Sequence, residues 1–284
     1  NLSFTKASQE LFVSQPAITK HIQELEAAYQ TRLFDRQGSR ISLTESGNLL
    51  LEHCERILED YKRLEYEMHL LHNEYTGGLK LGASTTIAQY VLPPLLASFI
   101  GKFPQVSLSL LNGNSREIEA ALQEHRIDLG FVEGVFRLPN IRYTTFLEDE
   151  LVAVVRTGSK LAVGEEITPD ELFHLPLVLR ERGSGTLDVF ERALQQHNIK
   201  LSSLQVLMYL GSTESIKLFL EHTDCLGIVS VRSITRELYS GQLRVVEIKG
   251  MPMLRDFSFA QPQGQESGLA QVFMQFAMHN NHKL

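Results

Sequence analysis

The sequence predicts an α/β protein with an N-terminal winged helix-turn-helix, one long helix, and a larger α/β domain divided into two subdomains. Three observations predict this fold: two short helical patterns followed by β-prone segments, a long apolar stripe at helical spacing, and alternating strand and helix patterns beyond Gly78. A chain of 284 residues is also too long for one small domain and suits two.

Residues 4–28 predict two short helices separated by a turn, because their apolar side chains recur at helical spacing. Ser14 is expected to cap the second helix, and Pro16 suits the first turn, where its missing N–H costs nothing. Residues 33–43 form two β-prone pieces around Gly38, which predict a β-hairpin wing, and Thr44 is expected to cap the next helix.

The next helix carries the clearest periodicity, with apolar residues spaced alternately four and three apart. They are Leu50, Cys54, Ile57, Tyr61, Leu64, Met68 and Leu71. The stripe is narrow and its flanks are charged, so we expect dimerisation through this helix. The alternative is an amphipathic helix that faces a core of its own domain.

Beyond Gly78 the patterns predict strands at 78–83, 106–111, 127–132, 151–155, 177–180, 204–210 and 226–231. They predict helices at 87–101, 115–124, 187–197, 214–222 and 268–279. Such βαβ alternation indicates a parallel sheet, and the length of this part suits two subdomains with a cleft between them.

The formal charge of −7 argues against a protein that coats nucleic acid through bulk charge, but it leaves a local basic site open. The two cysteines, Cys54 and Cys225, have no second cysteine or metal-spaced histidine beside them, so we expect no metal and no cofactor. No apolar run approaches the roughly eighteen residues of a membrane span, and no secretory signal is visible. We therefore expect a cytoplasmic protein without a membrane partner.

A set of motifs stands in order along the chain: Ser3–Ala7, Ser14–Ile22, Leu25-Glu26, Leu33–Arg36, Leu43–Gly47, Leu81–Thr86, Leu92-Pro93, Phe103-Pro104 and Ile127–Gly130. Together they resemble the LysR-type transcriptional regulators over essentially the whole chain. The family normally has another helix before Ser3, which this chain mostly lacks, as a trimmed N-terminus would explain. Glu133-Gly134 and residues 182–186 resemble the subgroup that includes regulators of cysteine biosynthesis and carbon fixation.

The resemblance implies a winged helix-turn-helix at 1–46, a linker and dimerisation helix at 47–76, and an effector domain at 79–284 similar to type 2 periplasmic binding proteins. Subdomain I would cover about 79–154 and 252–284, and subdomain II about 155–251. The implied protein is not an enzyme. It is a ligand-responsive regulator that binds double-stranded operator DNA, a small metabolite and itself, as a homodimer or homotetramer.

The start of the second helix of a helix-turn-helix enters the major groove. The residues expected to contact DNA there are Ser14, Gln15, Pro16, Ala17, Thr19 and Lys20. Gln15 can pair with an adenine edge, whereas Pro16 and Ala17 can meet a thymine methyl group.

Arg36 and Arg40 bracket the tip of the wing, where one could enter the minor groove and the other hold a phosphate. The alternative for Arg36 is a structural ion pair with Asp35 or another carboxylate. Residues 1–46 hold five basic and five acidic side chains, so DNA affinity must come from placed contacts and from several half-sites read by an oligomer.

Three hydroxyl-rich segments each end a strand and begin a helix. Their candidate effector-binding residues are Ser84, Thr85, Thr86, Ser184, Gly185, Thr186, Ser212 and Thr213. Individually they are ordinary helix caps, but together they predict a cleft that binds a small anionic metabolite, because helix N-termini favour negative charge without needing a buried Arg or Lys. Asn114 and Glu133 could add polar recognition, or either could be a solvated loop residue.

Enzyme readings are weaker. Residues 82–86 come near a nucleophile elbow but end in Thr instead of Gly, and no phosphate-binding loop of the GxxxxGK type is present. The main rival is a cytosolic solute-binding protein of the same cleft architecture, which would have no use for a DNA-reading helix.

Overall fold

The computed structural model describes residues 3–11, 13–37, 40–72, 75–134, 137–161, 164–263 and 268–281. The chain forms two compact units, Asn1–Asn73 and Glu74–Leu284. Within the described ranges, no helix combines the length and the apolar character needed to cross a membrane.

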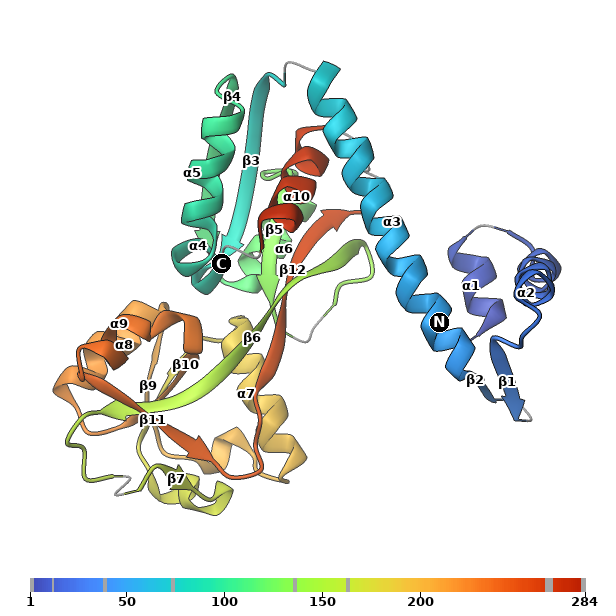
Figure 1. The fold of residues 1–284 in the computed structure, drawn as a ribbon. Coiled ribbons are helices and arrows are strands. Elements are labelled where there is room, and N and C mark those ends of the chain that lie inside the picture. Colours follow the sequence, from blue (N-terminus) through green and yellow to red (C-terminus); the bar gives the residue numbers. More distant parts are fainter. Residues whose placement is uncertain are drawn as a thin grey trace. The chain divides into compact units, whose positions relative to one another are not determined.

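The first unit is a winged helix-turn-helix followed by a long helix (Figure 1). Its elements are α1 (Phe4–Glu10), α2 (Gln15–Tyr29), β1 (Phe34–Gln37), β2 (Arg40–Leu43) and α3 (Glu45–His72). As expected, α2 begins after Ser14 and has Pro16 in its first turn, and β1 and β2 pair antiparallel as the wing. The expected cap is wrong in one detail, because the Ser14 hydroxyl makes no capping hydrogen bond.

Two side chains fix the loop between α2 and the wing. The Glu26 carboxylate accepts a hydrogen bond from the Leu33 N–H at 2.8 Å. Thr44 caps α3, as predicted, by accepting from the Gly47 N–H at 2.9 Å. A Cβ atom on Gly47 would lie 2.1 Å from the Leu33 carbonyl oxygen, so only glycine lets α3 start this close to the loop.

The second unit has two lobes. Lobe I contains β3 (Gly77–Ser84), α4 (Thr85–Tyr90), α5 (Leu92–Lys102), β4 (Val106–Gly113), α6 (Ser115–Gln123), β5 (Leu129–Glu133), β12 (Leu254–Pro262) and α10 (Leu269–Asn280). Lobe II contains β7 (Glu166–Ile167), η1 (Pro169–His174), β8 (Leu177–Arg180), α7 (Gly185–Gln196), η2 (Leu201–Ser203), β9 (Val206–Leu210), α8 (Thr213–His222), β10 (Leu226–Ser230), η3 (Val231–Ser233), α9 (Thr235–Tyr239) and β11 (Leu243–Ile248).

The strand order is β4-β3-β5-β12-β6-β10-β8-β9, where β6 is Ile141–Arg156, and β11 pairs with both β6 and β7. The expected parallel sheet is right for the outer strands of each lobe, β4-β3-β5 and β10-β8-β9. It is wrong for the middle, because β12 and β6 run antiparallel to their neighbours.

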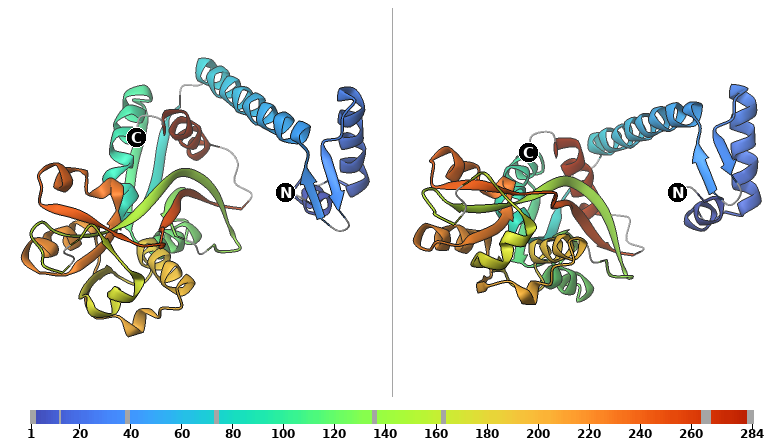
Figure 2. Two further views of the ribbon diagram at one scale, coloured as in Figure 1. Left: turned by 60° about the horizontal axis from the view of Figure 1, so that its bottom comes forward. Right: turned by 90° about the horizontal axis from the view of Figure 1, so that it is seen from below.

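Strand β6 belongs to both lobes. Residues 141–150 pair with β12 in lobe I, whereas residues 151–154 pair with β10 in lobe II. Figures 1 and 2 show β6 (yellow-green) running from one lobe into the other. The sequence predicted only residues 151–155 of this strand and missed β7, β11 and β12, because charged residues interrupt their apolar pattern.

Each lobe has its own core. Lobe I is built around aromatic rings, with Phe99 4.8 Å from Phe273 and Phe131 5.0 Å from Phe259 between ring centroids. Lobe II packs a separate, mainly aliphatic set of residues from β8, β10 and α7, together with the ring of Phe190. The apolar cores of the two lobes are therefore separate, and crossing strands join the lobes.

The single helix expected at 87–101 is two helices. Val91, with φ −113° and ψ −51°, lies between α4 and α5, and Pro93 falls at the start of α5, where no N–H partner is required. The break leaves α4 as a short helix at the end of β3, so that Thr85 and Tyr90 can face different parts of lobe II.

Candidate functional site

The start of α2 is the exposed end of the helix-turn-helix. Ser14, Gln15, Pro16 and Lys20 are exposed, and Ala17 is half-buried. This end of the helix therefore presents a polar amide and a lysine to solvent, with two small apolar groups between them.

Two predicted DNA contacts already have intramolecular partners. The Thr19 hydroxyl donates to the Gln15 carbonyl oxygen at 3.1 Å. The Lys20 ammonium lies 3.7 Å from the Glu24 carboxylate, but both side chains are exposed, and such pairs contribute little. The backbones of Arg36 and Arg40 lie on either side of the wing turn, whereas their side chains fall outside the described part of the structure.

Four residues of the predicted stripe on α3 are exposed. Ile57 is 65% exposed, Tyr61 57%, Leu64 55% and Met68 48%, while Leu50 and Cys54 are half-buried. The side chain of Leu71 lies outside the described residues. These large apolar side chains are therefore not packed in a core formed by the described residues.

The predicted helix caps of the second unit fall where expected, at the carboxyl ends of strands. The Ser184 hydroxyl accepts from the Thr186 N–H at 3.2 Å, and the Ser212 hydroxyl accepts from the Ser215 N–H at 3.1 Å. Asn114 forms a capping box with Glu117. The polar groups of these three residues therefore serve their own helices.

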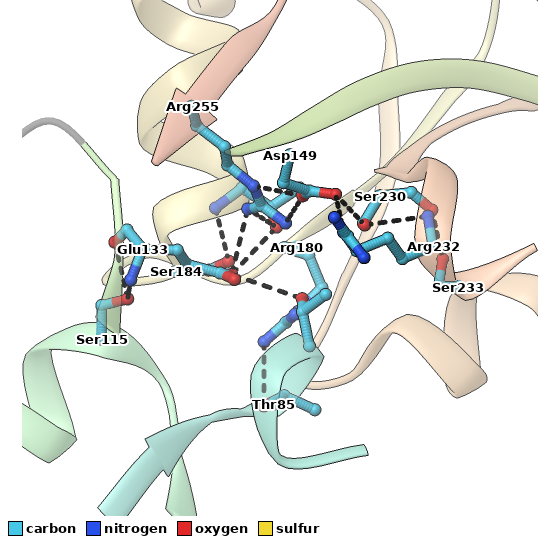
Figure 3. Close-up of polar contacts among 12 residues, drawn as sticks. Thr85, Ser115, Glu133, Asp149, Arg180, Ser184, Ser230, Arg232, Ser233 and Arg255 are labelled. Carbon is cyan, nitrogen blue, oxygen red and sulfur yellow. Dashed lines mark hydrogen bonds and ion pairs between the residues drawn. The ribbon is translucent and has the colours of Figure 1, made fainter. Parts of the chain in front are cut away.

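Ser84 and Thr85 differ from these caps. The Ser84 hydroxyl makes no capping bond and, although buried, has no hydrogen-bond partner in the described part of the chain. The Thr85 hydroxyl donates to the Gly113 carbonyl oxygen at 3.2 Å and accepts from Arg180 of lobe II at 3.4 Å. Figure 3 shows the Thr85 and Arg180 side chains pointing toward one another from different lobes.

Arg180, the last residue of β8, is a buried cation where lobe II meets Thr85 of lobe I. Its side chain is 1% exposed; Nε lies 2.8 Å from the Glu181 carboxylate, and Nη2 donates to the Gly211 carbonyl oxygen at 3.3 Å. The remaining nitrogen, Nη1, is buried without a partner among the described residues. A buried guanidinium N–H without an acceptor is costly unless an acceptor arrives.

Glu133, at the end of β5, joins both lobes through its buried carboxylate. Its Oε1 accepts from the Thr86 hydroxyl of lobe I at 3.4 Å and from the Thr186 hydroxyl of lobe II at 3.3 Å. Arg255 Nη1 lies 3.1 Å from the same oxygen. The sequence left open whether Glu133 was a solvated loop residue, and its burial excludes that reading.

Arg255 lies opposite Asp149 in the antiparallel pairing of β12 with β6. Its Nε and Nη2 both lie 2.7 Å from Asp149 Oδ2, and Nη1 donates to the Thr186 hydroxyl at 3.0 Å. The other Asp149 oxygen accepts from the Ser230 hydroxyl of lobe II at 2.7 Å (Figure 3). This network of buried charges therefore lies where the two crossing strands pass between the lobes.

The backbones of the two lobes also touch here. A Cβ atom on Gly185 would lie 2.2 Å from the Glu133 carbonyl oxygen, and one on Gly134 would lie 3.1 Å from the Gly185 Cα atom. The end of β5 and the start of α7 can approach this closely only because both positions are glycine.

A second contact between the lobes lies at the other end of α4. The Tyr90 hydroxyl donates to the Glu214 carboxylate of lobe II. The buried Lys217 ammonium lies 2.7 Å from Glu214 and 2.8 Å from Glu237. Burial, together with the Glu214 carboxylate, raises the pKa of Tyr90 well above its usual range. Burial acts to raise the pKa of Glu214, but bonds from Lys217 and Tyr90 outweigh it and lower that pKa.

Buried arginines lie where the two lobes meet, and the sequence analysis did not anticipate them. It missed Arg180, Arg255 and Asp149, which are all buried. Arg180 had a signal, since it ends the predicted strand 177–180 at the cleft edge. Arg255 had none, because β12 was not predicted.

The chain matches two family models. The bacterial regulatory helix-turn-helix protein of the lysR family matches residues 1–48, and the LysR substrate binding domain matches residues 72–281. The chain belongs to the LysR family of transcriptional regulators.

Curated relatives of this LysR-type regulator are similar over most of their length. The uncharacterized HTH-type transcriptional regulator YeiE of Escherichia coli is 35% identical over 246 residues, which are 87% of this chain and 81% of YeiE. A probable RuBisCO transcriptional regulator of Cyanidioschyzon merolae is 31% identical over 277 residues, 96% of this chain and 91% of that protein. The resemblance to regulators of carbon fixation is therefore confirmed.

Among solved structures, the CcmR regulatory domain of Synechocystis PCC6803 in complex with 2-PG matches the effector domain of this LysR-type regulator. The TM-score is 0.65 at 27% identity, covering 72% of this chain and 97% of that domain. The two-lobed α/β fold is thus that of LysR effector domains, and the relatives favour a regulator over the solute-binding alternative.

The Tyr90–Glu214 contact generates a pH prediction for this LysR-type regulator. The raised pKa of Tyr90 means that its contribution to stability is present below the ordinary tyrosine pKa, near 10, and is lost as the pH rises above it. We expect Tyr90→Phe to lower the free energy of unfolding by about 0.5–1.5 kcal/mol at pH 8 and to reduce the further loss between pH 8 and 11. Urea titrations at both pH values measure this.

Tyr143→Phe is the matched control, because the Tyr143 hydroxyl donates to Glu119 at 2.5 Å within lobe I, and burial raises its pKa as well. Both variants should flatten the alkaline loss, but only Tyr90→Phe should speed hydrogen exchange at the α4–α8 contact. Equal alkaline losses in Tyr90→Phe and the unmodified protein would contradict the assignment.

Proposed function

We propose that this LysR-type regulator binds operator DNA sequence-specifically and responds to a small anionic metabolite held in the cleft between its lobes. The observation that carries the proposal is Arg180 Nη1, a buried guanidinium nitrogen without a partner among the described residues. The same side chain contacts Thr85 of the other lobe, and the hydroxyl of the preceding residue, Ser84, is also buried without a partner in the described part of the chain. A carboxylate or phosphate oxygen would satisfy such donors.

The surrounding cleft supports the same ligand class. Thr86 and Thr186 bring hydroxyls from opposite lobes, Thr213 is buried at the start of α8, and Gly211 contacts Arg180. The buried Glu133 carboxylate lies among them. The CcmR domain, a relative of 27% identity, was solved with 2-PG, which supports a small-molecule effector for this chain as well.

Ligand contacts to both lobes would favour one orientation of the lobes, because a ligand shifts an equilibrium only by its difference in affinity for the two states. Helix α3 ends at His72 and β3 begins at Gly77, so the chain connects the effector domain to the linker helix within a few residues. We infer that the lobe preference passes to the DNA-reading helices along this connection, in the cytoplasm, where the operator is found.

Three surfaces support self-association. One is the apolar stripe on α3. The other two are the opposite edges of the long sheet, where the edge strands expose apolar residues: Leu110 and Leu111 on β4, and Leu207, Met208 and Tyr209 on β9. Open edge strands with apolar side chains are association sites, so a dimer through α3 can extend to a tetramer.

The anion site has a direct test. Arg180→Gln should weaken binding of an anionic effector by about 10- to 100-fold, because it removes a charge-assisted hydrogen bond. Thr85→Val and Thr186→Val should weaken it less. Calorimetric screening of carboxylates, sulfur oxyanions and sugar phosphates against the full chain finds the ligand and measures the effect.

Arg182→Gln is the control, since this nearby arginine is exposed. If the ligand that binds is apolar, or if Arg180→Gln and both valine variants bind an anion unchanged, the anion site is wrong while the family assignment stands.

If α2 reads DNA, two variants should differ in how they lose affinity for operator DNA and for random DNA. Gln15→Ala should weaken binding to a specific operator by about 1–3 kcal/mol and spare random DNA, because its amide reads a base edge. Lys20→Ala should weaken both and reduce the salt dependence, as loss of a phosphate contact does. Anisotropy titrations distinguish the two, and equal losses on both DNAs for Gln15→Ala would exclude base reading.

Dimerisation through α3 predicts that Ile57→Glu combined with Leu64→Glu converts the dimer to monomer, because charge would be buried at the seam. Sedimentation velocity measures the change. Arg56→Glu is the matched control, as it introduces the same charge on the same helix outside the stripe. An unchanged oligomer in the double variant would show that α3 does not form the seam.

A further inference from the structure

The Glu133 carboxylate occupies donors of the type that would hold a free anion. Its side chain is 2% exposed and its Oε1 is contacted by the hydroxyls of Thr86 and Thr186 and by Arg255 Nη1, at 3.4, 3.3 and 3.1 Å. Two hydroxyls from opposite lobes and a guanidinium make a suitable cradle for a carboxylate or phosphate oxygen.

We propose that Glu133 is a tethered internal competitor of the effector, a carboxylate of the protein itself that fills the anion cradle until a soluble anion displaces it. This rests on the proposed function, in which the cleft binds an anion. The competitor would set the concentration at which the regulator responds.

Glu133 is not needed to neutralise Arg255. Asp149 already does so, with Oδ2 2.7 Å from both Nε and Nη2, in register across the β6–β12 pair. Glu133 adds a second negative charge to the same guanidinium, on the third nitrogen. An incoming anion can therefore replace Glu133 without leaving Arg255 unpaired.

The Glu133 carboxylate lacks part of its hydrogen bonding in this position. Its Oε2 is buried without a hydrogen-bond partner in the described ranges. A buried carboxylate with one oxygen unsolvated is costly, and two of its three contacts to Oε1 are longer than a good charge-assisted hydrogen bond. The tethered carboxylate is thus a replaceable occupant of this cradle.

The backbone of Glu133 is anchored, whereas its side chain could rotate. Ser115 anchors the Glu133 backbone, since its hydroxyl donates to the Glu133 carbonyl oxygen at 2.8 Å and accepts from the N–H at 3.2 Å. Gly185 packs against the same carbonyl oxygen. The backbone is held from both lobes, so displacement would occur by rotation of the side chain, which needs no rearrangement of β5.

Internal competition lowers the apparent affinity for an anion by the fraction of molecules in which the cradle is free. Removing the charge while keeping the shape should therefore tighten anion binding. We expect Glu133→Gln to bind inorganic sulfate and phosphate about tenfold more tightly than the unmodified protein in calorimetric titrations of the full chain. Glu150→Gln is the matched control, since it removes an exposed carboxylate next to Asp149 and should change nothing.

A second variant gives an independent readout. Glu133→Ala opens the cradle, and sodium acetate should then raise its unfolding temperature more than sodium chloride of equal ionic strength does. The unmodified protein and Glu150→Ala should show no such difference. Circular dichroism and gel filtration establish that each variant is folded.

Equal anion affinity in Glu133→Gln and the unmodified protein, or equal effects of acetate and chloride on Glu133→Ala, would overturn the proposal and leave Glu133 a structural ion pair. Failure of the proposed function looks different. In that case the unmodified protein binds none of the anions screened, while the comparison between variants still decides whether Glu133 fills an anion cradle.

Discussion

The antiparallel pairing of β6 with β12 is the constraint on which the second unit depends. It aligns Asp149 with Arg255 at the point where β6 leaves lobe I, and this buried pair then reaches Ser230 and Thr186 of lobe II and Glu133 of lobe I. A buried ion pair is weak evidence for stability, because desolvation offsets the attraction. Its position at the crossing of the strands instead fixes which side chains face the cleft.

The lobes are held together by polar contacts, whereas each lobe is held by its own apolar core. Hydrogen bonds and ion pairs depend on the protonation and occupancy of each partner, so they can be exchanged for contacts to a ligand at little net cost. Apolar packing between the lobes would not allow this exchange. Apolar cores within the lobes and polar contacts between them suit a domain whose lobes stay folded while the contacts between them change.

Much of the fold was predictable because local chemistry dictates it. The start of α2 at Gln15 follows from Pro16, and the starts of α4, α7 and α8 follow from hydroxyl residues after apolar strands. The crossing strands β6 and β12 could not be predicted in full from the sequence, because they contain charged residues. A strand that passes between lobes has neither a continuous apolar run nor a clean alternation of apolar and polar residues. The missed Arg255 and Asp149 both lie on those strands, so part of the site was hidden for the same reason as part of the fold.

The charge balance of residues 1–46 and the apolar stripe on α3 are connected through the proposed DNA affinity. With equal numbers of acidic and basic side chains, one helix-turn-helix would gain little from counterion release, and the proposed DNA binding would depend on a few placed contacts. In the proposed dimer, two such units would bind two half-sites at once, and the second contact would become intramolecular. That gain in DNA affinity depends on the spacing of the two units. The DNA affinity of a dimer whose units each bind weakly would therefore be the most sensitive to a change in the effector domain.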